Sequence, residues 1–203
     1  MKPELAKHLD KVRETVAAVD RIVSAHSYPA DRRTVMVRGL LSTIIQHHRS
    51  ILLLLKSGGT FASPCALARD VVKGLRYGLW INSCATEEQI SRIETDDEFP
   101  FSIPEVIKEI EAAYSTDPFF EDLRKRWGAQ LYRYSRTDIF QLGRWNIDSG
   151  CGLHLDDGEV REMTTIATLC VVVLAAKFLA AQQHSADCKQ IETLAAGYAS
   201  RTS

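Results

Sequence analysis

Basic and aromatic side chains gather in the stretch that ends with YSRTDIFQLGRW, residues 134–145. The cations are Arg124, Lys125, Arg126, Arg133, Arg136 and Arg144, and the rings among them are Trp127, Tyr132, Tyr134 and Trp145. This combination suits single-stranded nucleic acid, because cations meet phosphates and rings stack on bases. The helix dipole also favours cations near a helix C-terminus without any ligand, and nearby acidic residues dilute the charge. Both interpretations stay open.

A second basic stripe is formed by Arg69, Lys73 and Arg76, which share one sector of an expected helix. The sector lies opposite the apolar residues Leu67, Val71 and Leu75. A phosphate or an acidic partner could bind such a stripe. Charge opposite a core face is ordinary for a solvated helix, and we favour that interpretation.

His47 and His48 are adjacent on another expected helix, so their side chains diverge by about 100°. They therefore cannot form the i, i+4 histidine pair of a single-helix metal site. His48 falls near the apolar face of its helix. A buried, hydrogen-bonded histidine is the alternative to a ligand or a catalytic base.

The stretch CGLHLDDGE, residues 151–159, offers several metal-ligating types within nine positions. Cys151 and His154 supply only two ligands, whereas a structural zinc site needs four. The acidic residues do not follow the spacing of a calcium loop. Asp156 or Asp157 is better explained as the N-cap of a helix. We therefore expect no metal and no cofactor.

Length and charge limit the class of protein. The chain has 203 residues, 45% of them hydrophobic, which fits one domain with a substantial core. Its formal net charge is -1, so no global field draws it to nucleic acid or to an anionic membrane. Five widely spaced cysteines and a charged N-terminal sequence without a signal-peptide pattern predict reduced thiols in the cytoplasm.

Helical periodicity dominates, and no segment alternates like a strand. We predict an all-α, single-domain helical bundle of seven to nine helices over residues 1–203. Residues 1–27 form a long first helix and residues 28–203 the bundle core. The first helix carries a heptad-like stripe, which predicts a homo-oligomer formed through it. The stripe consists of Leu5, Leu9, Val12, Val16, Val19 and Val23.

Cap signals predict where later helices begin. A helix from about Ala30 to Lys56 is followed by one with Ser63 as N-cap. Capping boxes are expected at Thr86 and at Ser102, and a further helix near Asp117 or Pro118. Residues 163–181 carry one charge, Lys177, and the longest apolar run, of 11 residues, is short for a membrane span. We therefore expect a buried core helix and no membrane association.

Two stretches, LARDVVKGLRYGLWINSCATEEQI (67–90) and LYRYSRTDIFQLGRW (131–145), resemble an uncharacterised bacterial family of all-helical proteins. In that family a helix with an arginine and Gly-x-Trp precedes Tyr-Thr-His-x-Gly and Gln-Leu-x-Arg. The matching positions are Arg69, Trp80, Tyr134, Gln141, Leu142 and Arg144. The resemblance covers about residues 35–180 and implies an all-helical fold without an assigned activity.

Two departures bear on that resemblance. Arg136 and Asp138 stand where the family pattern has His and Gly. An arginine does not titrate near neutrality and cannot act as a general base there. The resemblance therefore implies a divergent, catalytically silent version.

The chain also resembles, more loosely, the helical-bundle ribonucleases of bacterial toxin and phage-defence systems. Those proteins carry Arg-x(4–6)-His on one helix. Here Arg38 precedes His47 by nine positions and Arg144 precedes His154 by ten, so neither of these two pairs has the required gap. Fold analogy alone does not give function.

Taken together, these patterns predict a soluble, bacterial-type interaction or binding module. The alternative is an RNA-binding or RNA-cleaving protein. No residue is assigned a catalytic role, and the sequence leaves enzymatic activity open. The candidate binding residues are Arg69, His48, Arg136, Gln141 and Arg144. RNA or a protein is the expected partner.

Overall fold

The computed structural model describes residues 2–58, 61–96, 101–117, 145–146, 152–153 and 155–199, and the fold is all-α. The helices within these ranges are α1 (Pro3–Ser24), α2 (Arg32–Ser57), α3 (Ala62–Ser83), α4 (Glu87–Thr95), α5 (Ile103–Ala113), α8 (Asp157–Ala181) and α9 (Ser185–Ala199). A two-residue antiparallel pair, β1 (Trp145–Asn146) with β2 (Gly152–Leu153), accompanies them. Strands this short leave no alternating pattern in the sequence.

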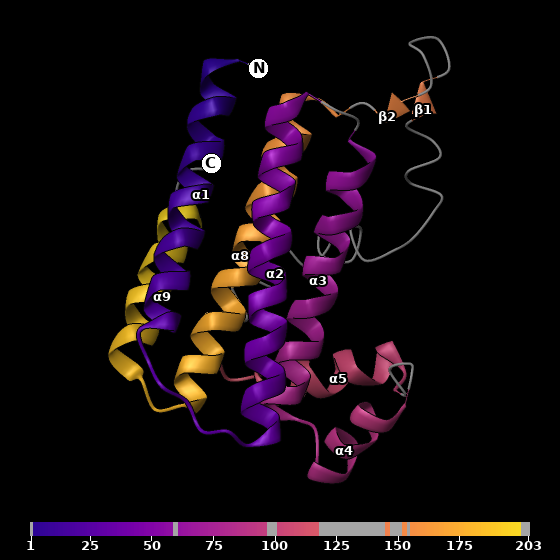
Figure 1. Cartoon of the computed structure of the whole chain (residues 1–203), viewed down its shortest axis with the longest axis vertical. Coiled ribbons are helices and arrows are strands. Elements are labelled where there is room, and N and C mark those ends of the chain that lie inside the picture. The colour runs from indigo at the N-terminus through magenta and orange to yellow at the C-terminus, as the bar shows by residue number, and fades with distance from the viewer. Residues whose placement is uncertain are drawn as a thin grey trace.

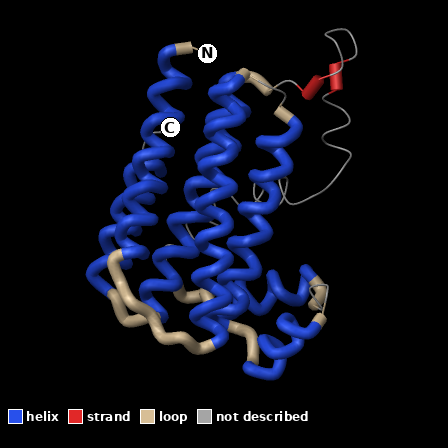
Figure 2. The backbone as a smooth tube through the Cα atoms, in the orientation of Figure 1, coloured by secondary structure: helices blue, strands red, loops and turns tan. Residues whose placement is uncertain are grey.

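The long helices run side by side, and α8 lies among them (Figure 1). It packs against α1, α2, α3 and α9, whereas the short helices α4 and α5 lie at one end. The tube in Figure 2 shows that the α1–α2 and α8–α9 connections are at that same end. The turn after α1 and the turn before α9 therefore come together although they are far apart in sequence.

Helix α8 is buried on every side, from Met163 to Leu179. It is long and apolar enough to cross a membrane by length and composition, yet 94% of its most apolar window is buried inside the protein. This confirms the predicted buried core helix. Its one interior cation, Lys177, pairs with Asp117 and lies 3.9 Å from Glu192 Oε1. Partners of opposite charge make the burial of an ammonium group tolerable.

The apolar stripe of α1 faces the interior of the same chain. Each of its six predicted members, from Leu5 to Val23, is no more than 6% exposed and belongs to the common core. The stripe is therefore occupied within one molecule, mainly by α8. Because the stripe is buried within one chain, substitution of Leu9 or Val16 by aspartate should disrupt folding, and the homo-oligomer stays a prediction.

The predicted helix starts are confirmed in part. Thr86 forms a capping box with Gln89, and Asp156 forms one with Glu159. Ser102 is the residue before α5, but its side chain makes no capping hydrogen bond. Pro104 at the second position of α5 has no N–H to donate, which removes one of the two usual donors.

The start of α3 differs from the prediction. Ser63 is not its N-cap, because α3 already begins at Ala62 and Phe61 precedes it. Pro64 therefore lies at the third position of the helix. The first N–H groups of a helix have no intrahelical partner, so proline is tolerated throughout the first turn.

The turn between α8 and α9 is closed by a Schellman motif. Gln183 adopts a left-handed φ of 63°. The His184 N–H donates to Leu179 O at 2.9 Å, and the Gln183 N–H donates to Ala180 O at 3.1 Å. These two bonds fix the position of His184, which stands immediately before α9.

Gln183→Gly should stabilise the protein by about 1 kcal/mol, because glycine adopts the left-handed conformation without a Cβ penalty. Urea unfolding of the two proteins measures the difference. Gln183→Ala is the matched control, since it removes the same exposed side chain but keeps the Cβ and gains nothing at this left-handed φ. Equal or lower stability of the Gln183→Gly protein would show that the turn is unstrained.

Candidate functional site

Three titratable side chains from opposite ends of the chain meet where the α1–α2 connection approaches α9. His26 follows the end of α1, His184 precedes α9, and Asp187 lies in the first turn of α9. An acidic residue is favoured in that first turn by the helix dipole. We call these three residues the His–Asp cluster.

The cluster is held by one hydrogen bond and one ring stack. His26 Nε2 lies 2.9 Å from Asp187 Oδ2. The His26 and His184 rings stack with centroids 4.0 Å apart and planes 26° from parallel. Tyr28 stands edge-on to His184, with its hydroxyl donating to Val23 O at 2.7 Å. The half-buried cluster is therefore positioned by several contacts and still reaches solvent.

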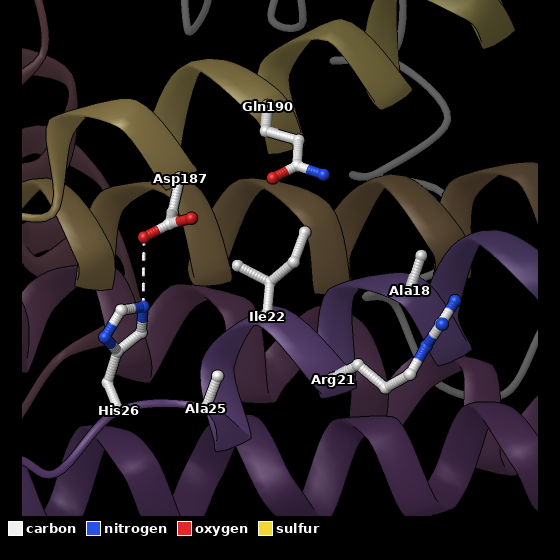
Figure 3. Close-up of a pocket in the computed structure, with 7 residues that line it drawn as sticks. All are labelled: Ala18, Arg21, Ile22, Ala25, His26, Asp187 and Gln190. Carbon is white, nitrogen blue, oxygen red and sulfur yellow. Dashed lines mark hydrogen bonds and ion pairs between the residues drawn. The ribbon is translucent and has the colours of Figure 1, made fainter.

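A groove of about 390 Å³ extends from the cluster between α1 and α9. Figure 3 shows the His26–Asp187 pair at one end of it and Ala18 with Arg21 toward the other. The lining residues are Ala18, Arg21, Ile22, Ala25, His26, Asp187 and Gln190. Apolar side chains of α1 and hydrogen-bonding groups of both helices thus share one open surface, which is typical of a binding site.

The cluster permits two kinds of chemistry. The carboxylate of Asp187 can orient the ring of His26, as in an acid–base pair. Within the described part of the chain, however, no serine, threonine or cysteine nucleophile is hydrogen-bonded to His26. The second kind is ligation, since two imidazoles and a carboxylate suit a transition metal.

The histidines of the interior are in a different state. His48 is 1% exposed, and its Nε2 lies 2.9 Å from Thr168 Oγ1. Thr168 Oγ1 donates its own proton to Thr164 O, so the His48 N–H is the donor to Thr168. The Nδ1 atom of His48 is then an acceptor without a partner in the described core. Burial, aided by Arg49, lowers the pKa of His48 from 6.5 to about 4.

His8 of α1 makes the same kind of contact with α8, one turn before Thr168. Its Nε2 lies 2.9 Å from Thr164 Oγ1, which donates to Val160 O. Burial, and then the charge of Arg161, lowers the pKa of His8 to about 4. Both rings are therefore neutral near pH 7, and they link α1 and α2 to the buried helix.

The residues proposed as a binding site from sequence are only partly described. His48 lies in the core, where it has almost no surface left to contact a ligand. Arg69 is half-buried on α3, and its Nε is buried without a hydrogen-bond partner among the described groups. Arg136, Gln141 and Arg144 lie outside the described residues, as do Cys151 and His154. Of the five residues, only His48 and Arg69 belong to the part of the chain that the structure describes.

The basic stripe of α3 is less solvated than expected. Lys73 is exposed, but Arg76 is half-buried near Cys170 of α8, and burial lowers the pKa of its guanidinium. Gly74 and Gly78 allow α2 and α8 to approach α3 closely, so the helix has little open surface. Only Lys73 fits the expected solvated face well.

The His–Asp cluster was missed from the sequence, although Arg21 and His26, which both line the groove, are separated by four residues, the Arg-x(4–6)-His spacing of the helical-bundle ribonucleases. His184 and Asp187 are three positions apart, a spacing that places them on one side of a helix start. That signal is weak alone, and His26 lies 161 positions before Asp187. Only the packing of α9 beside α1 shows that they meet.

The described residues define an all-α protein with an open groove that carries a histidine–aspartate pair at one end. Comparisons of the chain with protein-family models, with curated proteins and with solved structures found no match. What the protein binds is therefore inferred from its own residues.

Proposed function

We propose that the protein is a cytoplasmic binding module, a single-domain bundle of seven to nine helices that binds its ligand in the α1–α9 groove. The groove is the observation that carries this proposal. It is open to solvent, has an apolar floor and ends at a positioned His–Asp pair. The resemblance to an uncharacterised all-helical bacterial family belongs to the same proposal.

The groups that line the groove suit the binding of a small polar ligand. The pair of His26 and Asp187 lacks a bonded nucleophile among the described residues, while Arg21 and Gln190 add donors and an acceptor beside Ile22. Such groups recognise a small polar ligand by hydrogen bonds around an apolar contact. A homo-oligomer and an RNA or protein partner stay predictions.

Filling the groove should abolish ligand binding. We expect a nuclear magnetic resonance screen of small polar fragments to find ligands that shift the amides of Ile22 and Gln190. Ala18→Trp, which projects an indole into the groove, should remove these shifts. Ala112→Trp on exposed α5 is the matched control and should retain them.

Two results would contradict the proposal. Fragments that bind equally well to Ala18→Trp would place the site elsewhere. Salt-dependent binding of single-stranded RNA, steeply weakened between about 50 and about 200 mM salt, would favour the RNA alternative. Cleavage of that RNA with His48 as base would be difficult to reconcile with the burial of its ring.

A further inference from the structure

We propose that His26, His184 and Asp187 bind a divalent first-row transition-metal ion of the Zn²⁺ type at the end of the α1–α9 groove. This inference rests on the proposed function, because the ion would form one wall of the same ligand site. The three residues supply one ligand atom each. Neutral imidazole and carboxylate are a common donor set for zinc, cobalt and nickel.

The distances fit an ion after a small local movement. The three ligand atoms lie within 4.8 Å of one another, and His26 Nε2 is already 2.9 Å from Asp187 Oδ2. Bonds of about 2.0–2.2 Å in tetrahedral geometry place two ligand atoms roughly 3.3 Å apart. The largest separation therefore has to shrink by about 1.5 Å at most.

The backbone around the cluster allows that movement. His26 lies beyond the last residue of α1, and His184 lies in the turn before α9. Rotation of either side chain changes the ring stack without moving a packed helix. Asp187, in contrast, is fixed on the first turn of α9 and provides a stationary ligand.

The environment admits an ion and leaves room for a further ligand. The side chains of His26 and Asp187 are 27% and 31% exposed, so an ion can enter from solvent. Three protein ligands leave at least one coordination position of a zinc ion open. The groove between Ile22 and Gln190 adjoins the cluster, so a polar ligand bound there could fill that position.

No metal site was predicted from the sequence, because only ligands that lie close together along the chain were considered. Cys151 and His154 offered two ligands, and Asp156 caps α8 through the Glu159 N–H at 2.8 Å. The His–Asp cluster draws its ligands from both ends of the chain. Its assembly depends on the α1–α9 contact, which no local spacing shows.

Calorimetric titration of the chelator-treated full chain with Zn²⁺ tests the inference. We expect one ion per chain, with affinity reduced by more than about 100-fold in His184→Ala and in Asp187→Asn. Asp187→Asn retains an oxygen that accepts a hydrogen bond from His26, so its fold should be preserved. His47→Ala, on half-buried α2 surface away from the groove, is the matched control and should bind normally.

Two spectroscopic readouts need no variant. Zn²⁺ should shift the imidazole resonances of His26 and His184 and leave those of buried His48 unchanged. The Co²⁺ form should lack thiolate charge-transfer absorption, because no cysteine belongs to the proposed ligand set. A missing Zn²⁺ titration, unshifted His26 and His184 resonances, or thiolate absorption would overturn the metal proposal.

The metal proposal and the groove proposal can fail separately. Ala18→Trp blocks the far end of the groove and should leave Zn²⁺ binding intact. Fragment binding without Zn²⁺ binding would overturn the metal site alone. Zn²⁺ binding without any groove ligand would contradict the proposed ligand site and support the metal site.

Discussion

Acidification from pH 6.5 to about pH 4 is expected to remove about 3 kcal/mol of folding stability through His48 alone. The folded-state pKa of this ring is about 4, below the 6.5 of an unperturbed histidine. Between these values the unfolded chain binds the proton and the folded chain does not. The contribution of His48 to the free energy of unfolding is therefore fully present above pH 6.5 and is lost as the pH decreases toward 4.

His48→Leu should remove this dependence. Thr168 Oγ1 keeps its bond to Thr164 O at 2.8 Å, so the substitution leaves no hydroxyl without an acceptor. Urea unfolding at a series of pH values should show a slope lower by about one proton between pH 4 and 6.5. Gln46→Leu, exposed on the same helix, is the control and should retain the slope of the wild type.

The wild type and His48→Leu should both retain the part of the pH dependence that comes from His8, whose pKa is also lowered. An unchanged slope in His48→Leu would mean that the ring is protonated in the folded protein. That result would contradict the arrangement in which His48 donates from Nε2 to Thr168 and keeps Nδ1 unprotonated.

Much of the fold was predictable because the relevant signals are local. The heptad-like stripe of α1 and the apolar run of α8 both identify surfaces that must leave water. The capping box at Thr86 and the N-cap at Asp156 lie at helix starts, where their side chains accept hydrogen bonds from backbone N–H groups, whereas the capping box expected at Ser102 does not form. These patterns depend on neighbours within a few positions.

The partner of a buried face was not predictable from the same patterns. The stripe from Leu5 to Val23 would look alike whether it packed on a second chain or on α8. Periodicity shows that a face is buried, and it does not show against what. The homo-oligomer expected from the stripe therefore stays a prediction.

The candidate site was missed for a related reason. His26 and Asp187 are brought together by the antiparallel packing of α1 and α9, and the closing turn uses Gln183 in a conformation that usually favours glycine. A glycine at that position would have marked the turn. The burial of His48, in contrast, was foreseen as the alternative to a ligand or a catalytic base, because His48 falls near the apolar face of its helix.

Substitution of Gly74 or Gly78 by alanine is expected to lower the stability of the protein, because α3 lies very close to α2 and α8 at these positions. A Cβ at Gly74 would lie 2.3 Å from Ile44 Cγ2, and one at Gly78 would lie 2.6 Å from both terminal methyl groups of Leu174. Ile44 and Leu174 are themselves buried, and a β-branched isoleucine has little freedom to rotate. Alanine at either position therefore has to separate α3 from a neighbouring helix.

Overpacking of this kind costs about 1–3 kcal/mol, and the better helix propensity of alanine returns no more than about 1 kcal/mol. We expect Gly74→Ala to be the more destabilising of the two, because the terminal methyl groups of Leu174 can move more easily than Cγ2 of Ile44. Denaturant unfolding of each variant measures the loss.

Gly39→Ala provides the control of opposite sign. Gly39 is exposed within α2, and no described atom lies within 4 Å of a Cβ built there. With no contact to oppose it, helix propensity alone should stabilise the protein by about 0.5–1 kcal/mol. If Gly74→Ala stabilised the protein as much as Gly39→Ala, the close contact of α3 with α2 would be wrong, because the gain in helix propensity is the same in the two substitutions and only the contact differs.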